Sequence, residues 1–106
     1  MSWFKRKVKS DDRLLGRWIV DPSDNAALAA LGQVSLEFDD QGNLNYIIVS
    51  EEKSQVVLLT YRVDGTTIIT DQPSHSSEQR TIYVIDGDRL TLSFDGEPSN
   101  FIRPPN

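Results

Sequence analysis

From residue 33 onward, short stretches of alternating apolar and polar residues recur between turn residues, and this regularity constrains the fold most. The segment 34–38, for example, alternates Val, Leu and Phe with Ser and Glu, which is the period of two of a half-buried strand. Asp, Gly and Asn residues, which supply turn geometry, separate such stretches. The pattern predicts strands at residues 16–20, 34–38, 44–51, 55–63, 66–71, 80–85, 89–94 and 100–103.

One hairpin unit repeats along the chain. The segment 61–70, YRVDGTTIIT, returns as YVIDGDRLTL at 83–92, an offset of 22 residues. The dipeptide Asp64-Gly65 is favoured at a tight type I′ turn, because both central residues of that turn need positive φ. Successive hairpins of equal length indicate an up-and-down meander, and closure of the meander into a barrel removes its two exposed edges.

A short helix is expected at residues 24–31, between the first and second strands. Ser23 is the expected N-cap, an alanine- and leucine-rich run propagates the helix, and Gly32 ends it. Residues 11–15 are expected to form one helical turn before the first strand. The predicted fold is therefore all-β: an eight-stranded antiparallel up-and-down barrel with one short helix between strands 1 and 2, in a single domain at 11–106.

Two sequence motifs carry a resemblance to a known family. Leu15-Gly16-Arg17-Trp18 opens the first strand and Phe101-Ile102-Arg103 closes the last one. With the hairpins between them, these motifs resemble the small bacterial lipocalin-like domains of the calycin superfamily. The resemblance implies a structural signature of Gly16, Trp18 and Arg103, in which the arginine lies over the tryptophan face, a contact worth about 0.5–2 kcal/mol.

Composition argues against catalysis and against metal or cofactor binding. The chain has no Cys, so thiolate chemistry is excluded, and its one histidine, His75, lies in a polar loop beside Ser74, Ser76 and Ser77. Adjacency within one loop does not make a catalytic triad, and no orienting acid can be assigned. The aspartates beside glycines are explained by turn geometry. We expect no catalytic residue, no metal, no cofactor and no enzyme.

Charge is distributed unevenly along the chain. Residues 1–18 sum to +4 and the remainder to −9, for a net charge of −5. An acidic body does not favour nucleic acid as a partner. Residues 1–10 are expected to be a basic, solvated segment; contact of residues 3–9 with an anionic membrane surface is the alternative. Because charges interrupt this start and no long apolar run follows, neither a signal peptide nor a membrane span is expected, and the predicted location is the cytoplasm.

The predicted barrel interior suggests a binding function. Phe38, Tyr46, Tyr61 and Tyr83 all fall on the inward face, and buried phenol groups need hydrogen-bond partners. They are the candidate ligand-binding residues for a small hydrophobic or amphipathic molecule, with helix 24–31 as a lid. In the alternative reading, the tyrosine hydroxyls reach the barrel rim and meet water or backbone.

The outward face suggests a second function class. A turn at 51–54 pairs Ile47 with Leu58 and Val49 with Val56, so these four apolar side chains share the outer face. Ile69, Ile82 and Val84 add outward apolar positions on other strands. A filled barrel that forms a homo-oligomer through this face is therefore the alternative to ligand binding. If helix 24–31 or the N-terminal segment covered this face, no partner would be needed.

Overall fold

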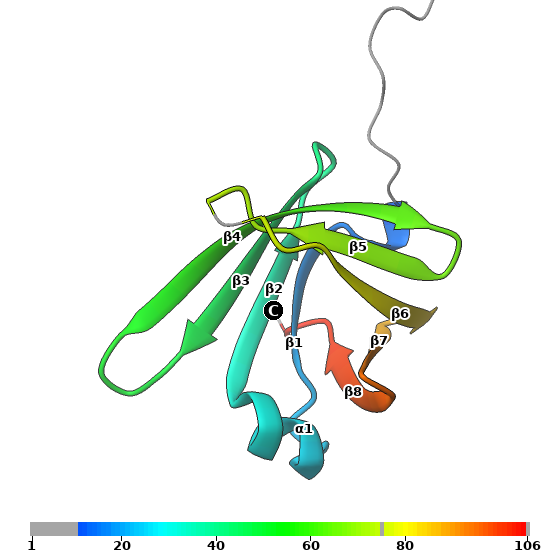
Figure 1. Cartoon of the computed structure of the whole chain (residues 1–106). Helices are drawn as coiled ribbons and strands as arrows, with labels where there is room; N and C mark the ends of the chain where they lie inside the picture. The colour runs from blue at the N-terminus through cyan, green and yellow to red at the C-terminus, as the bar shows by residue number, and fades with distance from the viewer. Residues whose placement is uncertain (1–10, 75, 106) are drawn as a thin grey trace, which may run out of the picture.

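Eight antiparallel strands close into a barrel in which each strand pairs with the next one along the chain (Figure 1). The computed structural model describes residues 11–74 and 76–105. The strands are β1 (Gly16–Val20), β2 (Gln33–Phe38), β3 (Asn43–Val49), β4 (Ser54–Asp64), β5 (Thr67–Asp71), β6 (Gln79–Asp86), β7 (Arg89–Phe94) and β8 (Glu97–Ile102). A 3-10 helix, η1 (Asp12–Leu14), precedes β1, and one α-helix, α1 (Asn25–Leu31), connects β1 to β2.

Two residue pairs close the barrel between its first and last strands. Ile19 pairs with Ile102 and Val20 with Phe101, while the other neighbouring strands pair in sequence order. The predicted eight-stranded up-and-down barrel with one helix between strands 1 and 2 is confirmed. Because successive strands run in opposite directions, the turns between them lie alternately at the two ends of the barrel. η1 and the β2–β3 turn lie at the same end, which we call the closed end.

The hairpin turns differ in one respect from the prediction. Asp64 pairs with Thr67, so the central residues of that turn are Gly65 and Thr66, and of these only Gly65 has positive φ, at 64°. Type I′ geometry needs positive φ at both positions, so the prediction of that turn type at Asp64-Gly65 is wrong. The β7–β8 turn meets the requirement instead, because Asp95 and Gly96 have φ of 51° and 85°.

The register between β3 and β4 also differs from the prediction. Ile47 pairs with Val56, not with Leu58, and Val49 pairs with Ser54. The Ser50 N–H donates to the Lys53 carbonyl over 3.2 Å, so the turn holds two residues rather than four. The register moves by two residues, and because side chains alternate with a period of two, the outward residues remain outward.

Helix α1 begins one residue later than predicted. Asp24, not Ser23, is the N-cap, and its carboxylate accepts from the Ala27 N–H over 3.0 Å. Gly32 ends the helix as expected, with φ of 74°. Ala27 is buried, so the helix packs one face against the end of the barrel away from η1.

The inward positions predicted from alternation are buried in the core or packed against it. Trp18, Phe101, Leu14, Leu36 and Leu90 are its largest fully buried side chains. Ile69 departs from the prediction of an exposed outward position: it is only 3% exposed, although it does not belong to the core inside the barrel. Its cross-strand neighbours are Arg62 and Arg80. Both arginines lie within 3.3 Å of Glu78, so their side chains cover Ile69 from outside.

In the described part of the chain, no helix is long and apolar enough to cross a membrane. Residues 1–10, including the candidate membrane-contacting segment 3–9, lie outside the described residues.

Candidate functional site

A cavity of about 180 Å³ lies inside the barrel. Six strands, β2 to β7, supply the residues that line it, whereas β1, β8 and α1 contribute none of those described. The lining residues are Leu36, Phe38, Leu44, Tyr46, Leu59, Ile68, Thr70, Gln79, Thr81, Leu92 and Phe94. Helix α1, which was predicted to act as a lid, therefore supplies none of the residues that line this cavity.

The cavity has an apolar floor and a partly polar mouth. Five buried side chains make the floor: Leu36, Phe38, Leu44, Ile68 and Leu92. At the mouth, partly or fully exposed polar side chains come from two neighbouring strands, Thr70 from β5 and Gln79 and Thr81 from β6. A molecule that enters would place an apolar part on the floor and could exchange hydrogen bonds at the mouth.

Tyr46 is the one ionisable side chain among the described residues that line the cavity. Burial raises its pKa, so the phenol stays neutral at physiological pH and can donate a hydrogen bond. No carboxylate, Lys or Arg belongs to the described lining. The cavity therefore suits a neutral polar group better than a charged one, because a buried charge without a partner is costly.

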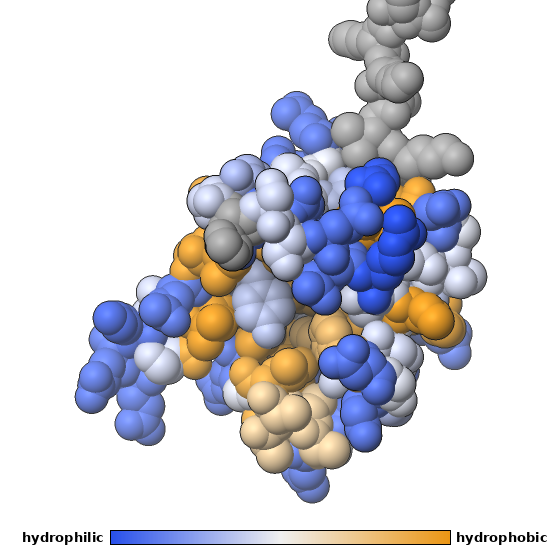
Figure 2. Space-filling model, viewed as in Figure 1, coloured by the Kyte–Doolittle hydropathy of each residue, from blue (hydrophilic) through white to orange (hydrophobic). Residues whose placement is uncertain are grey.

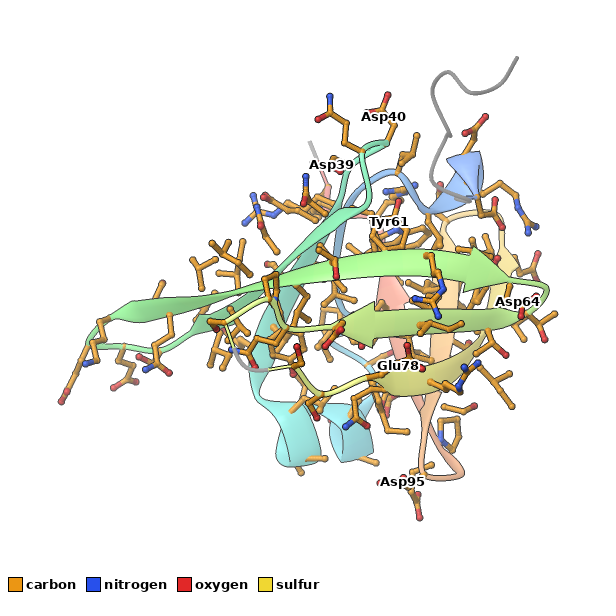
Figure 3. The ribbon with its side chains drawn as sticks, turned by 45° about the horizontal axis from the view of Figure 1, so that its top comes forward. Asp39, Asp40, Tyr61, Asp64, Glu78 and Asp95 are labelled. Atoms are coloured by element: carbon orange, nitrogen blue, oxygen red, sulfur yellow. The ribbon has the colours of Figure 1, made fainter. Side chains whose placement is uncertain are left out.

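The structure divides the four predicted ligand-binding residues into two groups. Phe38 and Tyr46 line the cavity. The hydroxyls of Tyr61 and Tyr83 point to the closed end: that of Tyr61 donates to the Asp39 carbonyl over 2.6 Å, and that of Tyr83 donates to Asp11 Oδ2 over 2.8 Å. Figure 3 shows Tyr61 on β4 beside the turn that carries Asp39 and Asp40.

The environment of these two tyrosines keeps both phenols protonated. Burial, followed by the nearby charge of Asp39, raises the pKa of Tyr61 to about 12. Burial and the hydrogen bond to Asp11 likewise raise the pKa of Tyr83 to about 12. Phe38 joins the two groups, because its ring meets that of Tyr61 edge to face with centroids 5.0 Å apart. Tyr61 and Tyr83 thus fasten the closed end, while Phe38 extends from there into the cavity floor.

Trp18 and Arg103 seal the closed end. The Arg103 guanidinium carbon lies 3.8 Å from the centroid of the fully buried Trp18 ring, the contact that the resemblance implies. The guanidinium also donates to the carbonyls of Arg13 and Arg17, over 2.8 and 3.0 Å. Gly16 permits this approach, since a Cβ at this position would lie 3.1 Å from Arg103 Nη1.

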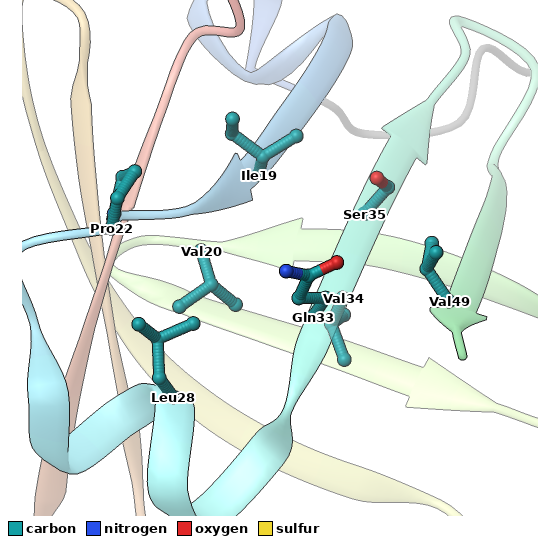
Figure 4. Close-up of a pocket in the computed structure, with 8 residues that line it drawn as sticks. All are labelled: Ile19, Val20, Pro22, Leu28, Gln33, Val34, Ser35 and Val49. Atoms are coloured by element: carbon teal, nitrogen blue, oxygen red, sulfur yellow. The ribbon is translucent and has the colours of Figure 1, made fainter. Parts of the chain in front are cut away.

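A second pocket, of about 300 Å³, lies at the gap where β1 and β2 separate to enter α1 (Figure 4). Leu28 of the helix lines one side of it and Val49 of β3 lines the other, and Gln33 and Ser35 add polar groups. The pocket separates α1 from the end of β3. The helix therefore does not cover the outer face of the β3–β4 hairpin, which was one of the two covers considered from the sequence.

The predicted interface residues do share the outer face of this hairpin. Ile47 is partly buried, whereas Val49, Val56 and Leu58 are 39%, 54% and 63% exposed. On β6, Ile82 and Val84 are similarly exposed. Figure 2 shows apolar surface along the hairpin behind its hydrophilic tip.

Three aspartates lie at separate turns rather than in a common site. Asp39, Asp64 and Asp95 lie at three separate turns (Figure 3), and Asp39 accepts from the N–H groups of Gln41 and Asn43. Within 11–74 and 76–105, no three His, Cys, Asp or Glu side chains gather in a way that could hold a metal ion. His75 lies outside the described residues.

Sequence reasoning did not single out the polar mouth of the cavity. Thr70, Gln79 and Thr81 face inward at the positions where a core strand would carry apolar residues. Polar residues at inward-facing positions of alternating strands were the signal that could have located it. Comparison of the chain with family models, with curated proteins and with solved structures gave no match.

Proposed function

We propose that this protein is a noncatalytic lipocalin-like module that binds a small, neutral amphipathic molecule inside its barrel. The observation that carries the proposal is the cavity of about 180 Å³, apolar at its floor and polar but uncharged at its mouth. An apolar cavity of roughly 150 Å³ in another protein is large enough for benzene. Room for one ring, or for a short aliphatic chain with a polar end, is therefore present. Membership of the calycin superfamily, a bacterial origin and a cytoplasmic location belong to the same proposal.

The arrangement of the mouth supports the choice of a neutral polar end. Thr70 pairs with Gln79 across β5 and β6, and Ile68 pairs with Thr81, so two hydroxyls and an amide lie along one side. Tyr46 adds a protonated phenol from β3. These groups can donate to and accept from a hydroxyl or an amide, whereas a carboxylate or an amine would find no opposite charge among them.

The test is a titration of the full chain with cyclohexanol, followed by NMR. We expect saturable shifts at floor residues such as Leu36 and Leu92, and weaker binding of cyclohexanecarboxylate at the same sites. Thr81→Trp, which places bulk in the mouth, should weaken cyclohexanol binding by roughly tenfold or more. Ile82→Trp adds the same bulk to the outer face and should leave binding unchanged. Absence of saturable shifts in the unaltered chain, or equal binding by both variants, would overturn the proposal.

Self-association through the outer face is a second candidate function. The observation in its favour is the exposure of Val56 and Leu58, both more than half exposed on neighbouring positions of one face. Contiguous apolar surface of this kind often marks an interface in soluble proteins. This function is independent of the cavity, because the two sets of side chains lie on opposite faces of the barrel wall.

A further inference from the structure

The β3–β4 hairpin leaves one edge of β4 without a neighbouring strand. β4 has eleven residues, but it pairs with β5 only from Thr60 to Asp64. The preceding six residues, Ser54–Leu59, pair with β3 alone. Figure 1 shows this hairpin projecting beyond the end of β5. We call residues Ser54–Leu59, on the side away from β3, the free edge.

Alternation along β4 identifies the backbone groups that the free edge presents. The Tyr61 N–H donates to the Gly42 carbonyl, on the β3 side of the strand, and the Lys53 carbonyl accepts from Ser50 on the same side. Residues 55, 57 and 59 therefore direct their backbone groups towards β3, and Val56 and Leu58 direct theirs to the free edge. Within the described residues, no backbone partner takes up those groups.

The corresponding edge of β8 shows how this fold covers exposed backbone elsewhere. Asn100 lies beyond the two residue pairs between β1 and β8. Its N–H donates to Asp24 Oδ2 over 3.0 Å, and its carbonyl accepts from the Asp21 N–H over 2.9 Å. The segment that leads into α1 thus protects β8. At the free edge, by contrast, the chain after Asp71 departs from β4, and an open groove of about 370 Å³ separates Gln72–Ser74 from residues 56–58.

We propose that the free edge pairs with the free edge of a second copy of this chain, antiparallel and about a two-fold axis. This proposal rests on the self-association proposed above and specifies its geometry. An antiparallel pair of identical strands is self-complementary, so each copy supplies the donors and acceptors that the other lacks. The outward side chains of Val56 and Leu58 then lie beside those of the partner, so the apolar face continues across the junction.

The charges along β4 favour this occupant and this direction. Residues 54–60 carry no charge, so two acidic molecules can approach each other here. The hairpin tip, Glu51-Glu52-Lys53, sums to −1, whereas Arg62 and Asp64 beyond the other end of the uncharged stretch sum to zero, and Arg62 is paired with Glu78. Parallel pairing would bring the two acidic tips together, whereas antiparallel pairing keeps them at opposite ends of the junction.

Sedimentation of the full chain over a range of concentrations tests the proposal. We expect a monomer–dimer equilibrium, with Leu58→Lys raising the dissociation constant by roughly tenfold or more, because lysine on an edge strand blocks pairing. Val84→Lys is the matched control: its side chain is 61% exposed, close to the 63% of Leu58, but Val84 pairs with Thr91 of β7, and β6 pairs with β5 as far as Ile82. This variant should dimerise like the unaltered chain.

A second measurement separates edge pairing from packing of the outer faces. Dimerisation should slow hydrogen exchange of the Val56 and Leu58 amides, while the Val57 and Leu59 amides, already bonded to β3, should change little. Val56→Pro removes one edge-facing N–H without removing a bond to β3, and should abolish dimerisation in a folded chain. A monomer at all concentrations overturns both the proposal and the self-association on which it rests. A dimer that Val56→Pro leaves intact, with unprotected Val56 and Leu58 amides, overturns edge pairing alone.

Discussion

The Arg103 guanidinium lies over the Trp18 ring, 3.8 Å from its centroid, and joins the end of the last strand to the first strand. Only two residue pairs link β1 to β8, so this contact carries part of the closure that backbone pairing leaves incomplete. The Trp18 indole N–H also donates to the Leu14 carbonyl over 2.9 Å, which fixes η1 across the closed end. One buried ring therefore holds three segments: η1, β1 and the residue after β8.

Truncation of Trp18 should destabilise the barrel strongly. Trp18→Ala removes a fully buried side chain and leaves a cavity, at a cost of about 3–5 kcal/mol.

Arg103→Lys should cost about 1–2 kcal/mol, since lysine keeps the charge but cannot reproduce the two carbonyl contacts in the same geometry. Urea unfolding measures both. Arg17→Lys, at a half-exposed arginine 3.8 Å from Glu37, is the control, and an equal loss there would contradict the role of Arg103.

Gly16 should be intolerant of a side chain for two reasons. Its φ of 102° is unfavourable for other residues, and a Cβ would lie 3.1 Å from Arg103 Nη1. We expect Gly16→Ala to cost about 1–3 kcal/mol. Gly32 also has positive φ, but a Cβ there would meet nothing within 4 Å, so Gly32→Ala should cost less in the same unfolding assay. Equal costs would show that the contact with Arg103 adds nothing.

The sequence was sufficient for the fold because its signals are local. Alternation assigns each strand its inward face, and the glycine-containing turns mark where the chain reverses, as at Gly65 and Gly87, which both have positive φ. The register of β3 and β4 was not predictable in the same way. Two turn lengths preserve the same alternation, and the contact between Ser50 and Lys53 selects the shorter one.

The candidate site was less predictable than the fold, because it depends on position along the barrel axis. Tyr61 and Tyr83 occupy equivalent positions in the 22-residue repeat, and both hydroxyls reach the closed end. Tyr46 lies outside that repeat and lines the cavity. Alternation shows that all three side chains face inward, but it does not show how far along the barrel axis each one lies. That position decides which of them a ligand can contact.

Asp24 should couple helix α1 to strand β8. Its carboxylate accepts from the Ala27 N–H at the start of the helix and from the Asn100 N–H and side-chain amide, and these hydrogen bonds lower its pKa. Asp24→Ala should lower the free energy of unfolding by about 1–3 kcal/mol, because the helix loses its N-cap and the edge of β8 loses its cover. Hydrogen exchange of the Asn100 amide should speed up. Asp40→Ala, at an exposed turn position, is the control, and unchanged Asn100 exchange in Asp24→Ala would contradict the coupling.

Asp11 should make the stability of the protein depend on acid pH. Hydrogen bonds from Arg13, and then from Tyr83, lower the pKa of Asp11 from an ordinary 3.8 to about 2. Because the folded-state pKa is the lower one, the contribution is complete above about pH 4 and is lost as the pH falls towards 2. Screening by solvent keeps its size near about 1 kcal/mol. Urea unfolding across this window should show a smaller pH dependence for Asp11→Asn than for the unaltered chain, whereas Asp12→Asn, at the exposed neighbouring position, should retain it. The same pH dependence in Asp11→Asn would show that Asp11 is not the titrating group.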